Sequence, residues 1–291
     1  MKVFFKVLVA IQLCVFLSLI SNAQDTTLVR IETKDGNEYL GTIVSENDQT
    51  IVLKTETLGE IFIQKMNIKH REVINAKQIV KGQVWFENPQ STRYFWAPNG
   101  YGLKKGEGYY QNIYVFWNQF SVGITDNFSL GGGILPLLLL GGGPTPIFIT
   151  PKVTIPISKD KWNLGAGALI GTVLGEDFGS FGIVYGLSTF GSPDRNLTIG
   201  LGYGFFDGEW AERPLINVSG MIRASKRMYF LTENYYINAG GEGGAVLGIG
   251  GRWLIKRASI DAIIAIPVGS GFDTTILFPL IGFVLPFGNS K

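Results

Sequence analysis

The stretch 196–206 alternates without a break between large apolar side chains and small or polar ones. Because a β-strand sends successive side chains to opposite faces, one face of such a strand is a continuous apolar ribbon. The pattern is typical of a barrel strand that has lipid on its outside and a lumen on its inside. The apolar members are Leu197, Ile199, Leu201, Tyr203 and Phe205, and glycine, threonine and asparagine occupy the positions between them.

The N-terminus is typical of an export signal. Lys2 and Lys6 precede an apolar run from Val7 to Ile20, and small residues lead up to Ala23. The run is shorter than the roughly 20 residues that a membrane-spanning helix needs. We therefore expect residues 1–23 to be a signal peptide that is removed on export.

The composition excludes several classes of function. Charged residues make up 16% of the chain, against about 25% in an average soluble domain, and 39 residues are glycine. The formal net charge of +2 is too small to indicate a nucleic-acid partner. Cys14, the only cysteine, lies within the signal, so we expect neither a disulfide nor a cysteine metal site in the mature chain.

Residues 24–76 form a separate, charge-rich segment that predicts a small periplasmic β module. Its turn residues, such as Asp35-Gly36, favour a positive φ and separate short apolar runs. We expect strands over 28–32, 38–44, 50–55 and 60–65, with a possible fifth at 72–74. The spacing of Asp35-Gly36, Gly41 and Asp48 resembles Sm-like and SH3-like small barrels. The Arg-Gly pair with which the Sm-like family contacts RNA has no match, so we expect no nucleic acid to bind.

From residue 109 to the C-terminus, strands alternate with connections that are in turn tight and long, as in an outer-membrane barrel. Eleven strands would leave the two ends of the barrel on opposite sides of the membrane. We therefore place one more strand at 91–97, within the connector 77–108, which predicts an antiparallel transmembrane barrel of 12 strands, with 10 as the alternative. The expected strands are 109–125, 128–138, 146–157, 162–174, 181–191, 196–206, 214–224, 228–237, 243–255, 259–269 and 274–287.

Side chains in these strands separate into two faces. In the strand 181–191 we assign Ile183, Tyr185 and Leu187 to one face, and Gly182, Gly186 and Ser188 to the polar lumen face. Aromatic residues near strand ends are expected at the membrane interface, where their apolar rings and polar edges are both accommodated. The candidates are Phe128, Trp162 and Trp253 near tight turns, and Phe205 near the opposite end.

Charged residues within strands fall on the polar face. The lumen-facing candidates are Lys152, Arg223, Glu233, Arg252 and Asp261. Two interpretations remain open. The charges form a structural ion-pair network across the barrel wall, or they form a constriction that selects a permeant solute.

The segments from Gly106 to Asn112 and from Gly123 to Gly131 resemble the first hairpin of uncharacterised porin-like outer-membrane proteins of Gram-negative bacteria. The resemblance implies an outer-membrane location. Outer-membrane lipid, lipopolysaccharide and the barrel-insertion machinery are then the expected partners. Phe287 is the last aromatic residue, close to the C-terminal position that this machinery recognises.

The barrel contains no histidine, because the single histidine, His70, belongs to the N-terminal module. Outer-membrane phospholipases, palmitoyl transferases and omptin-type proteases resemble this barrel in outline, but their catalysis uses a histidine in the barrel or at its rim. We therefore expect no enzyme activity, no cofactor and no metal site. The sequence predicts a passive pore or small-solute channel. The alternative is a structural or assembly anchor whose periplasmic module binds an envelope partner.

Overall fold

The computed structural model divides into two compact units, with the boundary in the chain between Trp85 and Phe86. The expected signal peptide, residues 1–23, lies outside the described residues. The boundary falls inside the expected connector 77–108, because most of that connector packs within the second unit. The described residues are 28–74, 79–80, 83–85, 87–114, 116–136, 143–175, 179–239, 242–255, 257–269 and 277–288.

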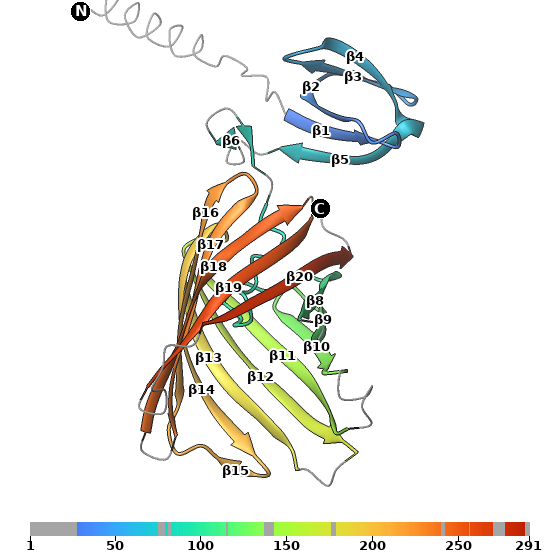
Figure 1. Cartoon of the computed structure of the whole chain (residues 1–291). Helices are drawn as coiled ribbons and strands as arrows, with labels where there is room; N and C mark the ends of the chain where they lie inside the picture. Colours follow the sequence, from blue (N-terminus) through green and yellow to red (C-terminus); the bar gives the residue numbers. More distant parts are fainter. Residues whose placement is uncertain are drawn as a thin grey trace, which may run out of the picture. The chain divides into compact units, whose positions relative to one another are not determined.

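The first unit is a five-stranded antiparallel sheet in the order β4-β3-β2-β1-β5 (Figure 1). Its core contains Val29, Ile31, Ile51, Leu53 and Ile63. The four expected strands and the possible fifth are confirmed. The strands are β1 (Leu28–Thr33), β2 (Glu38–Glu46), β3 (Thr50–Thr55), β4 (Gly59–Gln64) and β5 (Ile68–Ile74), with a 3-10 turn at Lys65–Asn67 and a small hairpin of β6 (Ile79–Val80) and β7 (Gln83–Val84).

The turn between β1 and β2 follows from its sequence. Gly36 has a φ of 89°, which a glycine adopts without steric cost. The carboxylate of Asp35 accepts hydrogen bonds from the Thr33 hydroxyl and the Asn37 side-chain amide. These bonds hold the reversal that brings β2 back alongside β1.

The second unit is a closed antiparallel barrel of 12 strands. Each strand pairs with the next along the chain, and β20 pairs with β8 to close the ring (Figure 1). The two-residue strand β15 (Glu209–Trp210) extends the connection after β14. The barrel strands are β8 (Glu107–Ile113), β9 (Trp117–Gly123), β10 (Phe128–Ile134), β11 (Thr145–Ser158), β12 (Trp162–Leu174), β13 (Phe181–Ser192), β14 (Arg195–Phe206), β16 (Leu215–Ser225), β17 (Met228–Ala239), β18 (Glu242–Ile255), β19 (Ala258–Gly269) and β20 (Phe278–Gly288).

The outside of the barrel is apolar along the length of its strands. In β14 the predicted ribbon is exposed, with Leu197, Ile199 and Leu201 each 46–54% accessible, whereas Thr198 between them is fully buried. A soluble protein does not expose contiguous apolar surface of this extent without a partner. In a bilayer the same surface is solvated by hydrocarbon, and the closed ring gives every barrel strand a neighbour on each side. No helix in the described ranges is long and apolar enough to span a membrane.

The predicted number of strands is correct, but two of the expected strands are wrong. Residues 91–97 form no barrel strand. The expected strand 109–125 is instead a hairpin of β8 and β9, which reverses around Tyr114 at a φ of 52°. The apolar sequence at this reversal contains none of the glycine, proline or asparagine residues that usually mark a turn, so alternation alone predicted one continuous strand.

The face assignment for β13 is also wrong. Tyr185 and Leu187 lie opposite Gly202 and Gly200 of β14, on the inner face that carries the buried Thr198. Ser188 lies on the outer face, where its hydroxyl accepts a hydrogen bond from the Trp162 indole at 2.9 Å. The glycines of the neighbouring strands leave inner space that the large β13 side chains fill.

The barrel has two distinct ends. Both ends of its sheet, Glu107 and Gly288, lie at the end where the connections are tight, which we name the turn end. The opposite end, which we name the loop end, carries the longer connections after β10, β12, β14 and β19. It also carries short connections between β8 and β9 and between β17 and β18, so the expected strict alternation of tight and long connections is wrong. Strands β8, β9 and β10 have 7 residues each, whereas the other nine have 11 to 14, so among the described residues the wall is shortest there.

Candidate functional site

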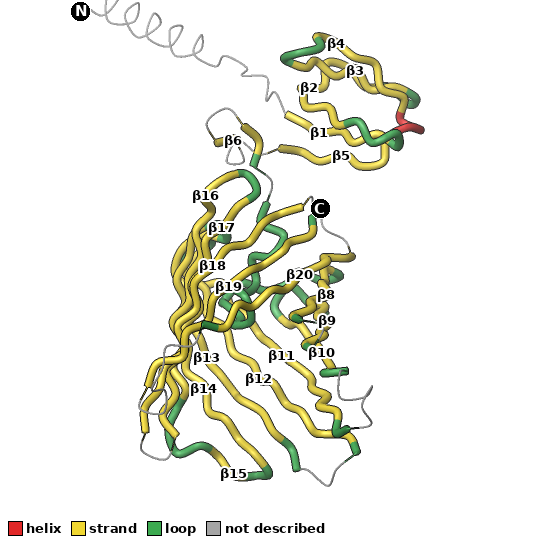
Figure 2. The backbone as a smooth tube through the Cα atoms, viewed as in Figure 1, coloured by secondary structure: helices red, strands yellow, loops and turns green. Residues whose placement is uncertain are grey.

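Residues 88–104, which we name the plug segment, lie inside the barrel (Figure 2). The segment has no regular secondary structure beyond one isolated bridge between Arg93 and Pro98. Nevertheless Tyr94 and Asn99 are fully buried and Gln90 is 1% accessible. A segment without strand partners is buried only when other groups satisfy its backbone N–H and C=O groups.

Side chains from strands around the whole ring supply those partners. Asn196 and Thr198 of β14 hydrogen-bond the hydroxyl of Tyr94, both at 2.7 Å. The Thr189 hydroxyl of β13 accepts from the Gly100 N–H at 2.7 Å, and the Gln111 amide of β8 donates to the Phe95 carbonyl at 2.9 Å. Contacts with strands on all sides are possible only for a segment within the lumen.

Arg252 and Asp261 form the central charged pair of this site. Both side chains are buried, and the Arg252 guanidinium binds both carboxylate oxygens of Asp261 at 2.8 Å. The same guanidinium donates to the Gln90 carbonyl at 2.8 Å and to the Tyr94 carbonyl at 2.6 Å. The guanidinium group has five N–H donors, so Arg252 binds the neighbouring strand β19 and the plug segment at the same time.

Lys152 and Glu233 hold the plug segment from other strands. The Lys152 ammonium donates to the carbonyls of Thr92 at 3.2 Å and Tyr101 at 2.7 Å. The Glu233 carboxylate accepts from the backbone N–H groups of Trp96 at 2.9 Å and Ala97 at 3.1 Å. Charged side chains thus bind main-chain groups of the plug, where charge-assisted hydrogen bonds are strong.

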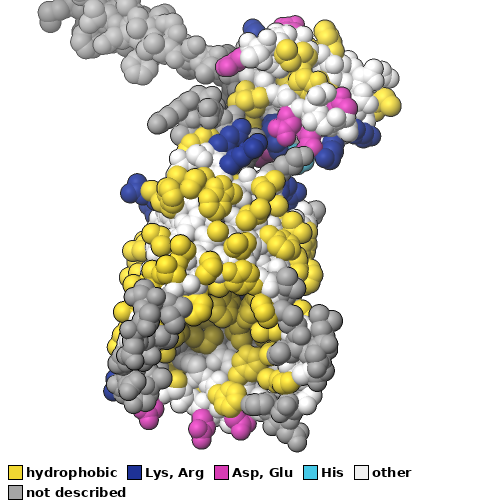
Figure 3. All heavy atoms as spheres, viewed as in Figure 1, with side chains coloured by type: hydrophobic (Ala, Val, Ile, Leu, Met, Phe, Trp, Pro, Cys, Tyr) yellow, Lys and Arg dark blue, Asp and Glu magenta, His cyan; other side chains and the backbone are white. Residues whose placement is uncertain are grey.

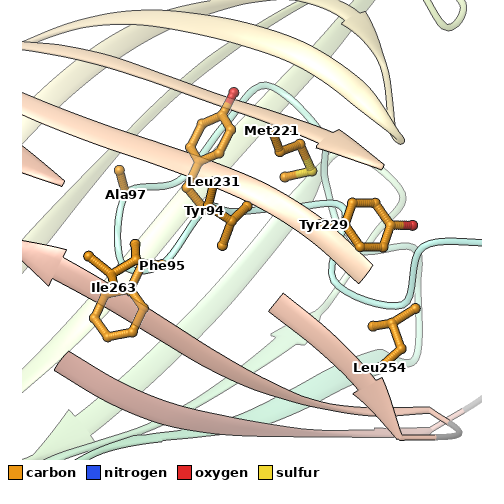
Figure 4. Packing of buried hydrophobic residues seen from close by; sticks show 8 residues of the cluster. All are labelled: Tyr94, Phe95, Ala97, Met221, Tyr229, Leu231, Leu254 and Ile263. Atoms are coloured by element: carbon orange, nitrogen blue, oxygen red, sulfur yellow. The ribbon is translucent and has the colours of Figure 1, made fainter. Parts of the chain in front are cut away.

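Apolar packing completes the contact between the plug segment and the wall (Figure 4). Tyr94, Phe95 and Ala97 project from the plug into a buried cluster with wall residues of β16 to β19. The wall members are Met221, Tyr229, Leu231, Leu254 and Ile263. The lumen near the turn end is therefore filled by protein in this structure.

Four of the five sequence-predicted lumen candidates meet at the plug segment: Lys152, Glu233, Arg252 and Asp261. The fifth, Arg223, lies at the turn end and forms an ion pair of 3.0 Å with Asp194, which also accepts from the Tyr229 hydroxyl. Of the opposite charges that the sequence placed on consecutive strands, Arg252 and Asp261 pair directly across the wall. Asn196 was placed on the polar face by its alternation, but its contact with the plug segment was not predicted. Gln111 and Thr189 were not singled out, because their type and spacing do not differ from those of ordinary strand positions.

The aromatic candidates lie near strand ends. Trp162 and Trp253 are 38% and 43% accessible near the turn end, and Phe128 begins β10 at the same end. Phe205 lies near the loop end, with its ring 5.1 Å from that of Trp210. This placement at two heights is consistent with two interfacial bands of aromatic residues.

The inner face changes character along the barrel axis. Near the turn end it carries buried polar residues such as Thr198, Ser219 and Arg252, each at 0% accessibility. Toward the loop end the inner positions are glycine or apolar, including Ile183, Val246 and Leu280, and these are only half-buried. The turn-end half of the lumen is thus polar and filled, and the loop-end half is apolar and hollow.

Within the described ranges, no three His, Cys, Asp or Glu side chains gather as a possible metal site. His70 lies on β5 of the first unit, opposite Glu32 of β1. The chemistry that the described lumen offers is hydrogen bonding, ion pairing and apolar contact.

No family model matches the chain, and no curated protein sequence matches it. Among solved structures it is similar to a loop-deletion mutant of OmpT, an outer membrane protein of Vibrio cholerae, with 11% identity and a TM-score of 0.36 over 90% of this chain and 97% of that one. It is also similar to OmpT itself from Vibrio cholerae, with 11% identity and a TM-score of 0.33 over 90% and 95% of the two chains. The barrel assignment therefore rests on this chain's own closed sheet and apolar exterior.

Proposed function

We propose that the chain is an outer-membrane channel for small solutes whose lumen is closed by the plug segment and opens when that segment moves. The observation that carries this proposal is the set of barrel side chains that bind the plug backbone, among them Arg252 and Lys152. These hydrogen bonds join the wall to a separate segment and can break without breaking the strand pairing of the wall. They therefore suit a plug that closes the lumen and can be released.

The strands of the barrel wall pair with one another without any contribution from the plug segment. The strand ladder is continuous around the ring without residues 88–104. If the segment leaves, Arg252 and Asp261 still neutralise each other, whereas Lys152 and Glu233 become free to meet water and solute. The lumen then acquires charged groups of both signs, as in a solute-selective pore.

The same proposal includes the location and partners of the protein. An even number of strands places both ends of the barrel sheet on one side of the membrane, which in bacterial barrels is the periplasmic side. The N-terminal module is then periplasmic, and the apolar exterior meets outer-membrane lipid and lipopolysaccharide after insertion by the barrel-insertion machinery. Its likeness to Sm-like small barrels stays a prediction.

A disulfide between the plug segment and the wall tests the closure. A Cβ atom at Gly102 would lie 3.5 Å from the Cβ of Thr154, within the range of about 3.5–4.5 Å for disulfides. In a Cys14→Ser background, we expect Gly102→Cys with Thr154→Cys to be silent in planar bilayers when oxidised, and to show voltage-induced openings after reduction. The matched control is Gly102→Cys alone, which should open under both conditions.

Silence of the reduced protein at all voltages, even with the plug weakened by Lys152→Met, would count against a channel. It would favour the second candidate function, an envelope anchor. That function is supported by exposed apolar side chains on the module: Phe62, Met66 and Leu58 are 75%, 71% and 63% accessible. Recovery of one specific envelope protein by crosslinking through Phe62 of the full-length chain, and its loss in Phe62→Ser, would support the anchor.

A further inference from the structure

The loop-end half of the lumen is a hollow lined by apolar side chains. Figure 3 shows the barrel hollowed toward this end, with hydrophobic side chains visible inside. The inner positions of four strands contribute half-buried residues: Leu169, Ile183, Tyr185, Val246 and Leu280. Of these, Leu280 also packs against the buried cluster of the plug segment. Space next to apolar side chains that lack packing partners is unfavourable when it is filled with water and favourable when it is filled with an apolar molecule.

Aromatic rings form the floor of the hollow. Trp96 of the plug segment is 48% accessible, although its backbone N–H is fixed by Glu233. Its ring contacts that of Trp117 edge-on at 4.8 Å, and Trp117 stacks on Phe148 at 4.2 Å. A ligand that enters from the loop end therefore meets an aromatic surface before it meets the charged contacts below.

The barrel wall is low on one side of the hollow. The Tyr114 N–H at the end of the β8–β9 hairpin donates to the Ile281 carbonyl, and the β20–β8 ladder begins at Gly282. Within the part of the chain that the structure describes, β20 residues Phe278 to Leu280 thus continue beyond the hairpin without a strand partner on that side. Pro279, which has no N–H to pair, is compatible with such an edge. Above the hairpin, the apolar hollow is continuous with the apolar outer surface of the barrel (Figure 3).

The charge of side chains at the rim of the loop end restricts which ligands can enter the hollow. The described connection after β14 carries the exposed carboxylates Asp207, Glu209 and Glu212, against one exposed cation, Arg213. A net negative rim disfavours entry of an anion. The described part of the apolar lining offers no buried charge with which to bind one, because Lys152, Glu233, Arg252 and Asp261 bind at the plug segment below the floor.

We infer that the loop-end hollow binds an uncharged, hydrocarbon-like small molecule that enters from the membrane over the short strands β8 to β10. This inference rests on the proposed membrane location and names the solute class of the proposed channel. Continuity of the hollow with the lipid-facing surface, its apolar lining and its acidic rim together favour this ligand over a sugar, an ion or a fatty-acid anion.

Quenching of Trp96 fluorescence by 1-bromodecane tests the inference with the full-length protein in nanodiscs. The Trp96 signal is the difference between each protein and the same protein carrying Trp96→Phe. The blocking variant is Gly204→Phe, since Gly204 faces the hollow beside Ile183 and its added Cβ would meet nothing closer than 3.7 Å. Gly186→Phe is the matched control, because Gly186 faces outward and its Cβ would meet nothing within 4 Å.

We expect saturable quenching in the wild type and in Gly186→Phe. In Gly204→Phe the half-saturating concentration should rise about tenfold or more, since the loss of contact with only two methylenes has that effect. Gly204→Leu, a smaller blocking variant, should show an intermediate rise and serves if the phenylalanine variant does not fold. Heat-modifiable gel mobility checks folding in each case.

Equal quenching in Gly204→Phe and Gly186→Phe would overturn the inference, because the bromoalkane would then act from the bilayer. Saturable quenching by 11-bromoundecanoate without quenching by 1-bromodecane would overturn it as well. The result is independent of conductance. Bromodecane bound in the hollow of a protein that never opens would contradict the proposed channel alone, and openings without binding would contradict this inference alone.

Discussion

Arg252 on β18 and Asp261 on β19 face each other inside the barrel, joined by two hydrogen bonds of 2.8 Å. The pair lies on adjacent strands in direct register, so the strand ladder positions both groups before the plug segment is added. The plug segment then supplies carbonyl oxygens to the donors of Arg252 that the carboxylate leaves free. A salt bridge within the wall is in this way also the anchor for the segment that closes the lumen.

Replacement of Arg252 by alanine is the most damaging single change that we predict at this site. It leaves the buried Asp261 carboxylate without its main partner, which costs about 3–5 kcal/mol for a buried pair. The double variant Arg252→Met with Asp261→Leu should be less damaging, because it removes both charges. Equilibrium unfolding in urea with detergent measures both, and equal losses in the single and the double variant would contradict the prediction.

Loss of the Lys152 charge should loosen the plug segment and leave the wall intact. Lys152→Met keeps much of the side-chain volume but removes the hydrogen bonds to Thr92 and Tyr101. Hydrogen bonds to charged groups contribute about 1.5–3 kcal/mol, so amide exchange in residues 92–101 should accelerate roughly tenfold to a hundredfold. Hydrogen-exchange mass spectrometry measures this rate. Lys161→Met, at an exposed turn, is the control that should leave it unchanged.

If lipid covers the outer face, a charged side chain on that face should destabilise the barrel, and more so the closer it lies to the middle of the membrane. Ile199, near the middle of β14, is 47% accessible, and Ile222, near the turn end of β16, is 43% accessible. Ile199→Arg should reduce the free energy of unfolding in lipid vesicles by about 2–4 kcal/mol, and Ile222→Arg by about 0–1 kcal/mol. Similar losses for both variants would argue against a bilayer around the barrel.

The N-terminal module should lose stability in acid through Glu46. The Lys65 ammonium at 2.8 Å and the Arg71 guanidinium at 3.0 Å hold the pKa of this carboxyl below its ordinary value of 4.5. Since the pKa is lower in the folded than in the unfolded module, the stabilisation is present above the unfolded value. It is lost as the pH falls through the folded one.

Hydrogen exchange of β2 and β5 in the full-length protein, corrected for the intrinsic effect of pH, measures this loss. Between roughly pH 5 and pH 3, the wild type should lose protection more steeply than Glu46→Gln. Glu56→Gln, in the turn between β3 and β4, is the matched control and should follow the wild type. An identical acid response of wild type and Glu46→Gln would contradict the assignment.

Most of the barrel strands were predictable because their signal is local. Alternation with period two, bounded by polar turn residues, located β12 at 162–174 and β14 at 196–206 to within a residue of their observed bounds. Arg252 and Asp261 were placed on the polar face for the same reason. The reversal at Tyr114 was missed, because a tyrosine in the left-handed region is held there by the surrounding barrel and has no local marker.

Alternation along most strands was enough to predict an antiparallel barrel with an apolar exterior, because successive residues of a strand point to opposite faces. The plug could not be found in this way. Tyr94, Phe95 and Trp96 have the β-propensity of a strand, and their burial depends on groups from strands across the lumen. The inward placement of Tyr185 and Leu187 likewise depends on space left by glycines of neighbouring strands. Contacts between segments distant in the chain decide which side chains fill the lumen, and no local pattern records them.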